Sequence, residues 1–301
     1  MADVATTASS YMGQGIVTQI LTGIVIVVIV YLTMATMEYL YNMFMRMWRD
    51  RLELFPYTYT SGSKMFTAIQ NPTNPAAKTI LVSNNQRSGV EFSYSMFIYL
   101  NSSTFANGTQ NLYHIMHKGY SQTYPLLGPG IFCWGNSNTL RVYMNSYDTW
   151  DNYTEVENVP VDKWFHIVVS CKGSTIYIYI NGNLKQKFAL SNAKPAYQNF
   201  GNVYLFSSRK MTLTTTQTSS LKADPYFTET TGGVPAPSSL TFDGSATGMA
   251  SRVYYFSYAL TYTEIQSLMT SGPSLRMSES VADTSMRPYL SDTWWTNKHG
   301  P

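Results

Sequence analysis

The stretch Thr175-Ile-Tyr-Ile-Tyr-Ile180, Asn181-Gly182, Asn183-Leu-Lys-Gln-Lys-Phe-Ala-Leu190 has the pattern of a β-hairpin. Isoleucine alternates with tyrosine before the Asn-Gly pair, and this period of two places the isoleucines on one face of a strand. Asn-Gly tolerates positive φ at both central positions of a turn, as a type I′ hairpin requires. The stretch therefore predicts two antiparallel strands joined by a two-residue turn.

Strand patterns continue on both sides of this hairpin. The segment Trp164-Phe-His-Ile-Val-Val-Ser-Cys171 is apolar on both faces, as a covered central strand is. Alternating or apolar runs also occupy residues 90–100, 140–144, 203–206 and 252–258. Because these short strands are separated by Gly, Asn and Pro clusters, we predict an all-β fold, a two-sheet antiparallel jelly-roll sandwich.

One short helix follows the last predicted strand. Thr261-Tyr-Thr-Glu264 is a capping box, and Gly272-Pro273 ends the helix. The residues beyond it, 273–301, show no regular period and are expected to form an irregular C-terminal tail.

Four segments occur in an order that resembles the laminin-G-like jelly roll, a concanavalin A-like domain. They are Trp164-Phe-His-Ile-Val-Val169, Tyr179-Ile-Asn-Gly182, Phe242-Asp-Gly244 and Ala259-Leu-Thr-Tyr-Thr-Glu-Ile265. The resemblance implies such a domain over residues 79–272, with a long loop at 207–240. The family often has acidic residues just before its last strand, where this chain has Gly248-Met-Ala-Ser-Arg252. We therefore transfer no metal or ligand role.

The N-terminal region predicts a membrane anchor. Residues 16–37 are 22 consecutive uncharged residues, long enough at about 1.5 Å per residue to span a bilayer as a helix. A cleaved signal peptide fits poorly, because residues 1–15, an N-terminal tail, contain no Lys or Arg. Residues 38–78 are expected to form a juxtamembrane helix and a linker.

The residues that flank this span predict its orientation. Arg46, Arg49 and Arg51 follow the helix, whereas only Asp3 precedes it, so the C-terminal part should stay cytosolic while the N-terminus crosses. The aromatic residues Tyr39, Tyr41 and Trp48 would lie with the three arginines at the membrane interface.

Composition favours a binding or structural protein over an enzyme. Charged residues make up 12% of the chain, and 20 basic against 17 acidic residues give a net charge of +3. This small, dispersed charge argues against nucleic-acid binding. The two cysteines, Cys133 and Cys171, permit at most one disulfide and are expected to stay reduced in the cytosol. We expect no cofactor.

Three asparagines, Asn101, Asn107 and Asn152, match the glycosylation pattern. They would stay bare if the body of the chain is cytosolic. Occupied sites would instead indicate the opposite topology.

The histidines and paired acids offer few catalytic candidates. His114 and His117 lie three residues apart on a predicted strand, which would send their side chains to opposite faces and exclude a metal pair. His166 lies in a predicted core strand and is expected to be hydrogen-bonded rather than catalytic. Glu155 and Glu157 share a face as a glycosidase acid pair does, but no third acid follows.

One loop is rich in oxygen ligands. Asp148, Asp151 and Glu155, with two asparagines nearby, are candidates for calcium, although the same residue types also favour a solvated turn. The aromatic residues of this region could form a sugar-stacking platform, part of the core or a protein contact: Trp134, Tyr147, Trp150 and Tyr153.

A second resemblance concerns the whole architecture. An anchor followed by a jelly roll with low charge is similar to minor capsid proteins of large DNA viruses with an internal membrane, such as chloroviruses. It implies a non-enzymatic tether between that membrane and the capsid, with the bilayer and major and minor capsid proteins as partners. The tail residues Tyr289, Trp294 and Trp295 are then candidate partner contacts. The alternatives are a membrane-anchored glycan-binding surface protein and a glycosidase.

Overall fold

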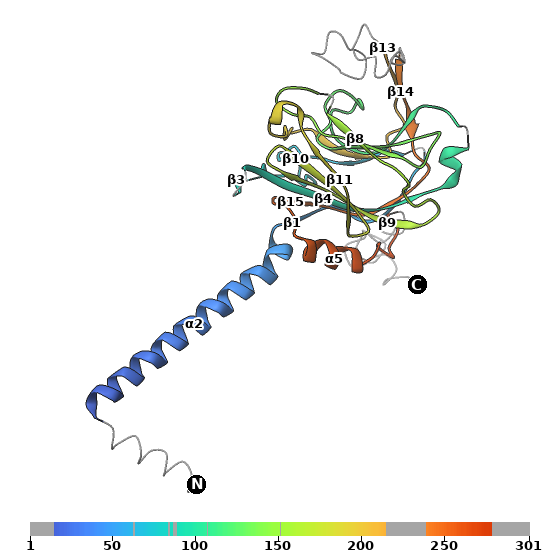
Figure 1. Ribbon diagram of the computed structural model, residues 1–301. Helices are drawn as coiled ribbons and strands as arrows, with labels where there is room; N and C mark the ends of the chain where they lie inside the picture. The colour runs from blue at the N-terminus through green and yellow to red at the C-terminus, as the bar shows by residue number, and fades with distance from the viewer. Residues whose placement is uncertain are drawn as a thin grey trace, which may run out of the picture. The chain divides into compact units, whose positions relative to one another are not determined.

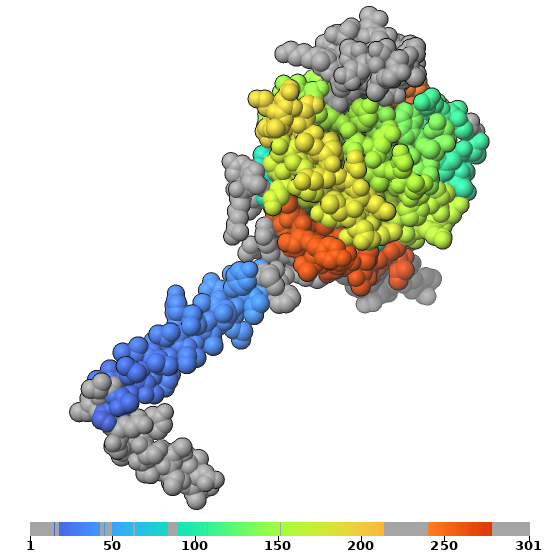
Figure 2. All heavy atoms as spheres, viewed as in Figure 1, coloured from blue at the N-terminus to red at the C-terminus, as the bar shows by residue number. Residues whose placement is uncertain are grey.

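The structure is a computed structural model that describes residues 15–62, 64–83, 85–86, 89–106, 108–150, 152–214 and 239–278. The chain divides into two compact units, Met1–Asp50 and Arg51–Pro301 (Figure 1). Figure 2 shows all heavy atoms of the chain in the same view.

The first unit contains one long helix, α2 (Ile16–Arg49), of 34 residues. It includes a candidate membrane span, Thr18–Asn42, whose most apolar stretch is 0% buried. A core helix of a soluble domain would bury one face, so length, composition and exposure together make α2 a candidate membrane anchor. The helix continues past residue 37 without a break, and Tyr39 and Tyr41 are exposed on it. The side chains of Arg46, Trp48 and Arg49 lie outside the described part of the chain.

The second unit is a sandwich of two sheets (Figure 1). The first sheet has the strand order β1-β15-β4-β9-β10-β11, with β3 paired to β4. Its strands are β1 (Arg51–Thr60), β3 (Asn85–Gln86), β4 (Gly89–Leu100), β9 (Trp164–Lys172), β10 (Thr175–Ile180), β11 (Asn183–Ala189) and β15 (Gly248–Phe256).

The second sheet has the order β13-β14-β5-β6-β7-β8, and β12 joins β5 to β2. Its strands are β2 (Phe66–Ala68), β5 (Leu112–Gly119), β6 (Gly130–Trp134), β7 (Leu140–Tyr143), β8 (Tyr153–Val156), β12 (Asn202–Leu205), β13 (Lys210–Thr214) and β14 (Ser239–Ser245). All pairings in both sheets are antiparallel except that of β14 with β5. The predicted antiparallel sandwich is confirmed.

The hairpin that predicted this fold forms as expected. Asn181 and Gly182 both have positive φ, 47° and 76°, at the turn between β10 and β11. The isoleucines at 176, 178 and 180 are buried and the two tyrosines between them are partly exposed. Alternation therefore assigned the faces of this strand correctly.

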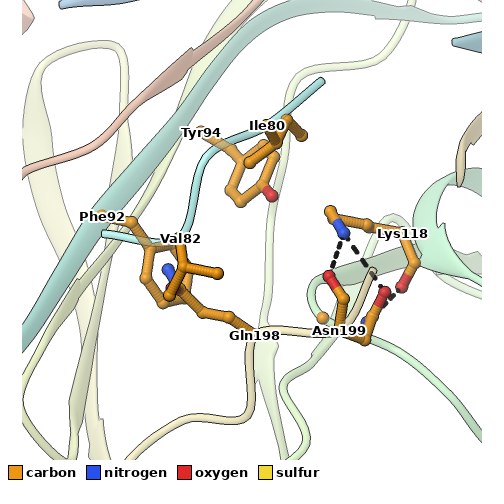
Figure 3. Close-up of a pocket in the computed structure, with 8 residues that line it drawn as sticks. Ile80, Val82, Phe92, Tyr94, Lys118, Gln198 and Asn199 are labelled. Carbon is orange, nitrogen blue, oxygen red and sulfur yellow. Dashed lines mark hydrogen bonds between the residues drawn. The ribbon is translucent and has the colours of Figure 1, made fainter. Parts of the chain in front are cut away.

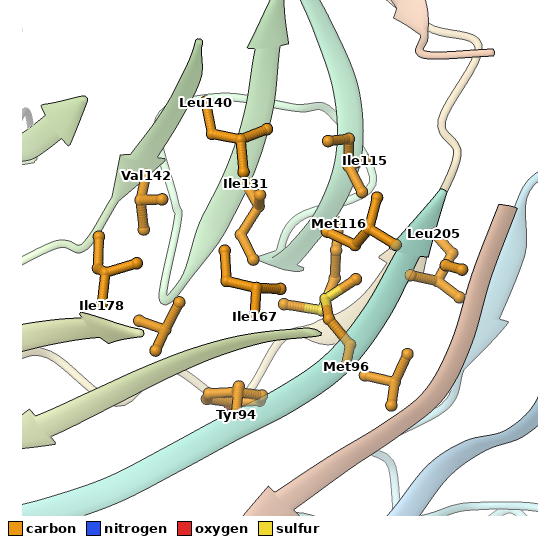
Figure 4. Packing of buried hydrophobic residues seen from close by; sticks show 14 of the residues in the cluster. Tyr94, Met96, Ile115, Met116, Ile131, Leu140, Val142, Ile167, Ile178 and Leu205 are labelled. Atoms are coloured by element: carbon orange, nitrogen blue, oxygen red, sulfur yellow. The ribbon is translucent and has the colours of Figure 1, made fainter. Parts of the chain in front are cut away.

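The main core lies between the sheets (Figure 4). Met96 and Ile167 from the first sheet meet Ile131 and Val142 from the second, and all four are almost fully buried. Each such side chain contributes about 1.5–3 kcal/mol by leaving water, so this apolar layer holds the two sheets together.

A short helix, α5 (Tyr262–Thr270), lies against the face of the first sheet that is turned away from the second (Figure 1). The predicted capping box is present, because the Thr261 side chain accepts from the Glu264 N–H and the Glu264 side chain accepts from the Thr261 N–H. Ile265 and Leu268 are buried beneath the helix, so its apolar side packs on the sheet.

Two predicted boundaries need correction. The sandwich begins at Arg51 rather than near residue 79, because β1 pairs with β15 inside the expected linker. Its Pro56 is tolerated because β1 is an edge strand. The expected loop 207–240 contains β13 and the start of β14, and residues 215–238 lie outside the described chain. The same is true of Tyr289, Trp294 and Trp295.

Candidate functional site

A small pocket opens where β4 and β5 meet two loops (Figure 3). The space between its walls and at its mouth, open solvent included, is about 250 Å³, and the enclosed part has room for about one water molecule. The lining comes from residues far apart in the sequence: Ile80, Val82, Phe92, Tyr94, Lys118, Gly128, Gln198 and Asn199. Four of these side chains are apolar or aromatic, and the polar ones lie on the β5 side and on the loop after residue 197.

The wall formed by residues 80–83 is fixed by hydrogen bonds. The Ile80 N–H donates to Gln70 Oε1 at 2.8 Å, and the Tyr255 hydroxyl donates to the Leu81 carbonyl at 3.0 Å. The Ser83 N–H donates to Gln198 Oε1 at 2.9 Å. Because three separate elements hold this segment, the pocket is preformed rather than opened by loop motion.

Lys118 lies at the polar end of the pocket and is 3% exposed. Its Nζ donates to the Asn199 carbonyl, to the Gly201 carbonyl at 3.1 Å and to Asn199 Oδ1 at 3.3 Å. No carboxylate pairs with it among the described residues. Burial lowers the pKa of Lys118 to about 8, and the carbonyl oxygens favour the charged form, so the ammonium is positive at neutral pH.

Tyr94 is the second polar group of the pocket. The residue is 3% exposed, and its ring packs against Phe92 at 6.0 Å and Tyr255 at 5.1 Å between centroids. Its hydroxyl has no hydrogen-bond partner in the described chain and points toward Lys118 in Figure 3. Burial raises the pKa of Tyr94 well above its ordinary value, so the hydroxyl stays protonated. Two donors therefore share a largely apolar pocket.

Sequence reasoning singled out neither Lys118 nor Tyr94. Tyr94 looks like any alternating core residue, and Lys118 looks like a charge at a strand end. A lysine directly after buried strand residues was the available signal, since lysine is almost never fully buried without a partner.

The two histidines of β5 correct a prediction. His114 Nε2 lies 2.6 Å from His117 Nδ1, so both side chains are on the same face. The cause is a register shift between His114 and Met116 against β6, which leaves Ile115 as the extra residue. Ile115 and Met116 both enter the core. A bulge of this kind breaks the alternation on which the prediction depended.

Hydrogen bonds assign the protons of this histidine pair. The Ser207 N–H donates to His114 Nδ1 at 2.9 Å, so His114 donates from Nε2 to His117 Nδ1. His117 then donates from Nε2 to the Tyr120 carbonyl at 2.7 Å. Burial lowers the pKa of both rings, that of His117 to about 4. All four ring nitrogens therefore take part in hydrogen bonds. We call this chain of hydrogen bonds through two neutral rings the histidine relay, and it leaves no free nitrogen for a metal.

His166 is hydrogen-bonded, as predicted. Its Nε2 lies 2.8 Å from Ser95 Oγ, and its ring lies 4.7 Å from that of Phe97. Burial lowers the pKa of His166 to about 4.

The Glu155 carboxylate accepts hydrogen bonds from neighbouring side chains. Its Oε1 accepts from Arg141 Nε at 2.9 Å and Nη2 at 2.7 Å, and from Trp134 Nε1 at 2.8 Å. The Arg141 guanidinium lies 4.6 Å from a Trp134 ring centroid and 4.1 Å from that of Tyr153. This ion pair and cation–π stack compete with any role of Glu155 as a calcium ligand or catalytic acid.

The rest of the proposed calcium loop is used internally. Asp148 Oδ2 accepts from Asn192, and Asn145 donates to the Trp150 carbonyl at 2.6 Å. Asp151 lies outside the described residues. No group of three or more His, Cys, Asp or Glu that could hold a metal ion occurs in the described chain.

The proposed aromatic platform is divided. Trp134 and Tyr153 flank Arg141, whereas Tyr147 is 68% exposed and packs on Tyr197 at 5.2 Å. These aromatics therefore do not form one continuous surface.

Other predicted residues have structural roles in the second unit. Arg51 pairs with Glu53 at 2.6 Å and lies 4.7 Å from the Tyr254 ring centroid. It therefore belongs to the sandwich, as the first residue of β1.

The cysteines and two of the glycosylation matches are also placed. Cys133 and Cys171 are buried free thiols. Asn101 caps a short 3₁₀ helix, and Asn107 lies outside the described residues. Asn152 is 5% exposed and binds Ser146 and Ser191. A glycan on Asn152 would therefore conflict with this fold.

Comparison with known proteins agrees with this architecture. Residues 74–218 match a family model described as the concanavalin A-like lectin/glucanases superfamily. The sandwich is thus a concanavalin A-like fold. No curated protein matches the chain.

Similar solved structures include toxin domains. The binding domain of botulinum neurotoxin serotype G is 15% identical, with a TM-score of 0.45 over 71% of this chain and 42% of its own. The receptor-binding domain of botulinum neurotoxin D is 12% identical, with a TM-score of 0.43 over 71% and 43%. The binding domain of botulinum neurotoxin DC, solved with rat synaptotagmin II, is 16% identical, with a TM-score of 0.36 over 60% and 35%. The chain covers less than half the length of each.

Proposed function

We propose that this protein is a non-enzymatic, membrane-anchored structural protein, a minor capsid component that tethers an internal viral membrane to a protein shell. The observation that carries the proposal is the exposed apolar helix α2 in the same chain as a concanavalin A-like sandwich. One part fits a bilayer, and the other has a fold that lectins share.

The occupied acids support a role without catalysis. Glycoside hydrolysis needs two free carboxyl groups flanking the sugar bond. Glu155 is tied to Arg141 and Trp134, so the Glu155 and Glu157 pair does not supply them.

The orientation is part of the proposal. Arg46 and Arg49 at the end of α2 keep the sandwich cytosolic by the positive-inside rule. In a virus whose internal membrane derives from a host compartment, the cytosolic side faces the capsid. Shell contacts would then come from the tail with Tyr289, Trp294 and Trp295, where buried aromatic anchors contribute about 2–4 kcal/mol each.

Sealed microsomes test the orientation. Added protease should digest the sandwich, and Asn101 and Asn107 should carry no glycan. Protection of the sandwich, or glycans on these residues, would overturn the cytosolic orientation.

Particle assembly tests the tether. A chain with Trp294→Ala and Trp295→Ala should still insert into membranes but should enter assembled particles poorly. Normal incorporation of this variant would contradict the proposed tail contact, and absence of the wild-type protein from particles would contradict the tether itself.

A second candidate function is glycan binding, favoured by the exposed Tyr147 in a concanavalin A-like fold. Tyr147→Ala should then weaken binding of the full-length protein on a glycan array. Absence of any glycan signal for the wild-type protein would exclude this candidate.

A further inference from the structure

We propose that the segment after α5 docks on the anionic surface of the bilayer that α2 enters. In this contact Leu275 inserts among the lipid headgroups, and Arg252 and Arg276 bind their phosphates. The docking surface consists of Arg252, Leu275, Arg276 and Met277. The inference rests on the proposed membrane anchor and adds a second contact between the chain and the same bilayer.

The exposure of Leu275 is the first reason. Leu275 is 99% exposed, and Met277, two residues further on, is 38% exposed. The segment that carries them is bonded to the sheet on both sides of the leucine. The buried Thr58 donates from its hydroxyl to the Ser274 carbonyl at 2.7 Å and from its N–H to the Arg276 carbonyl at 2.9 Å. The sandwich therefore presents this apolar side chain outward in a fixed position.

Cationic side chains beside the leucine are the second and independent reason. Arg276 is exposed, and Arg252 Nη1 donates to the Ser271 carbonyl at 3.0 Å, where the same segment begins. Neither arginine forms an ion pair with an acid of the described chain. Guanidinium groups bind phosphates with several hydrogen bonds, and an apolar side chain between them can reach the acyl boundary. Leu275 and its flanking arginines match both layers of a membrane surface.

The connection to the anchor brings this surface to the bilayer. One residue separates α2 from β1, and Arg51 follows the end of the candidate span, Asn42, by about 13 Å at the helical rise per residue. The Arg51 guanidinium lies 4.7 Å from the Tyr254 ring centroid. Burial raises the pKa of the Tyr254 hydroxyl, and Arg51 and Arg252 both lower it, so both guanidinium groups lie near this residue. The docking surface thus begins beside the strand residue that follows the anchor.

A bilayer is the occupant that this position favours. The anchor keeps the sandwich at the membrane, so the effective concentration of lipid near the docking surface is high and a weak contact still forms. The cytosolic leaflet carries anionic lipids, and each arginine near it favours the docked state about fivefold. Figure 2 shows α5 and the segment after it together on the surface of the sandwich.

Full-length protein in vesicles of phosphatidylcholine and phosphatidylserine tests the docking surface. Leu275→Cys carries an environment-sensitive fluorophore, because this side chain has no packing to lose and the two native cysteines are buried. Its emission should shift to shorter wavelength, and a lipid with a nitroxide near the headgroup should quench it. Leu184→Cys is the matched control, an exposed leucine on β11 at the opposite edge of the same sheet from β1. A label at this position should show neither effect.

Charge variants test the role of the arginines. Arg276→Gln should lower the ratio of docked to undocked label at position 275 about fivefold, and vesicles of phosphatidylcholine alone should also lower it. Lys185→Gln, at an exposed lysine of β11, should leave the ratio unchanged. Equal ratios in anionic and neutral vesicles would overturn the proposed phosphate contacts.

Flotation of the same vesicles measures insertion of α2 separately. Protein that floats with the vesicles but is quenched equally at positions 275 and 184 would overturn the docking surface and leave the anchor standing. Protein that does not float would contradict the anchor, and this inference with it. A shifted emission at position 275 without quenching by the nitroxide lipid would show that a protein, such as a second copy of this chain, covers Leu275, and would also overturn the lipid contact.

Discussion

Acid should destabilise the sandwich through the buried histidine relay. His117 has an ordinary pKa of 6.5 that burial lowers to about 4 in the folded chain. As the pH falls, the unfolded chain therefore takes up a proton on this ring before the folded chain does. The contribution of neutral His117 to the unfolding free energy is fully present above about pH 6.5 and is lost as the pH falls toward 4. Between pH 7.5 and 4.5 this one ring should remove about 2.5 kcal/mol, because each pH unit between the two pKa values is worth about 1.4 kcal/mol.

The contacts of the relay explain why the ring resists protonation. His117 Nδ1 accepts from His114, and a proton on that nitrogen would oppose two donors 2.6 Å apart. His117→Gln keeps a donor for the Tyr120 carbonyl but does not titrate. We expect it to lose about 1–2 kcal/mol at pH 7.5, and to lose about 2.5 kcal/mol less than wild type on acidification.

Urea unfolding of the full-length protein in nonionic micelles, followed by tryptophan fluorescence at pH 7.5 and 4.5, measures this difference. His166→Gln is the matched comparison on the other sheet, because burial also lowers the pKa of His166 to about 4. The acid-dependent losses of unfolding free energy from His117 and His166 should add, because the two rings have no contact in common. Equal acid losses in wild type and His117→Gln would refute the neutral relay.

Three further predictions concern the second unit. Arg141→Ala should destabilise the fold by about 2–3 kcal/mol in urea unfolding, because the Glu155 carboxylate loses its cationic partner and the cation–π stack is lost. A change below about 0.5 kcal/mol, the range of ordinary surface substitutions, would contradict this. Burial raises the pKa of the Cys133 and Cys171 thiols to about 12, so a disulfide reagent should label them only after unfolding; rapid labelling of the folded chain would show that they are accessible. Thr261→Ala should cost about 1 kcal/mol by removing the cap of α5, whereas Thr263→Ala serves as the control within the same helix.

Local sequence signals predicted the parts of the fold that depend on neighbouring residues. The Asn181-Gly182 turn and the Thr261 capping box each need only a few adjacent positions, and both are present. The edge strand β1 was missed because its partner β15 lies far away in the sequence and because a proline such as Pro56 is unfavourable inside most strands.

The candidate site was less accessible to sequence reasoning. The His114 and His117 contact depends on a bulge that only the pairing of β5 with β6 reveals. The pocket joins Tyr94 to Lys118 through the packing of two sheets and two loops. No spacing rule within one strand encodes such a meeting, because tertiary packing sets it.

The position of β15 has a consequence for biosynthesis. β1 pairs with β15, and about 200 residues separate Arg51 from its partner Phe256. β15 also separates β1 from β4, so neither strand can complete its hydrogen bonding until this late segment leaves the ribosome. We expect the anchor to enter the bilayer while its neighbouring strand still lacks a partner. A nascent chain halted before Gly248 should therefore need a chaperone at the membrane surface to avoid aggregation.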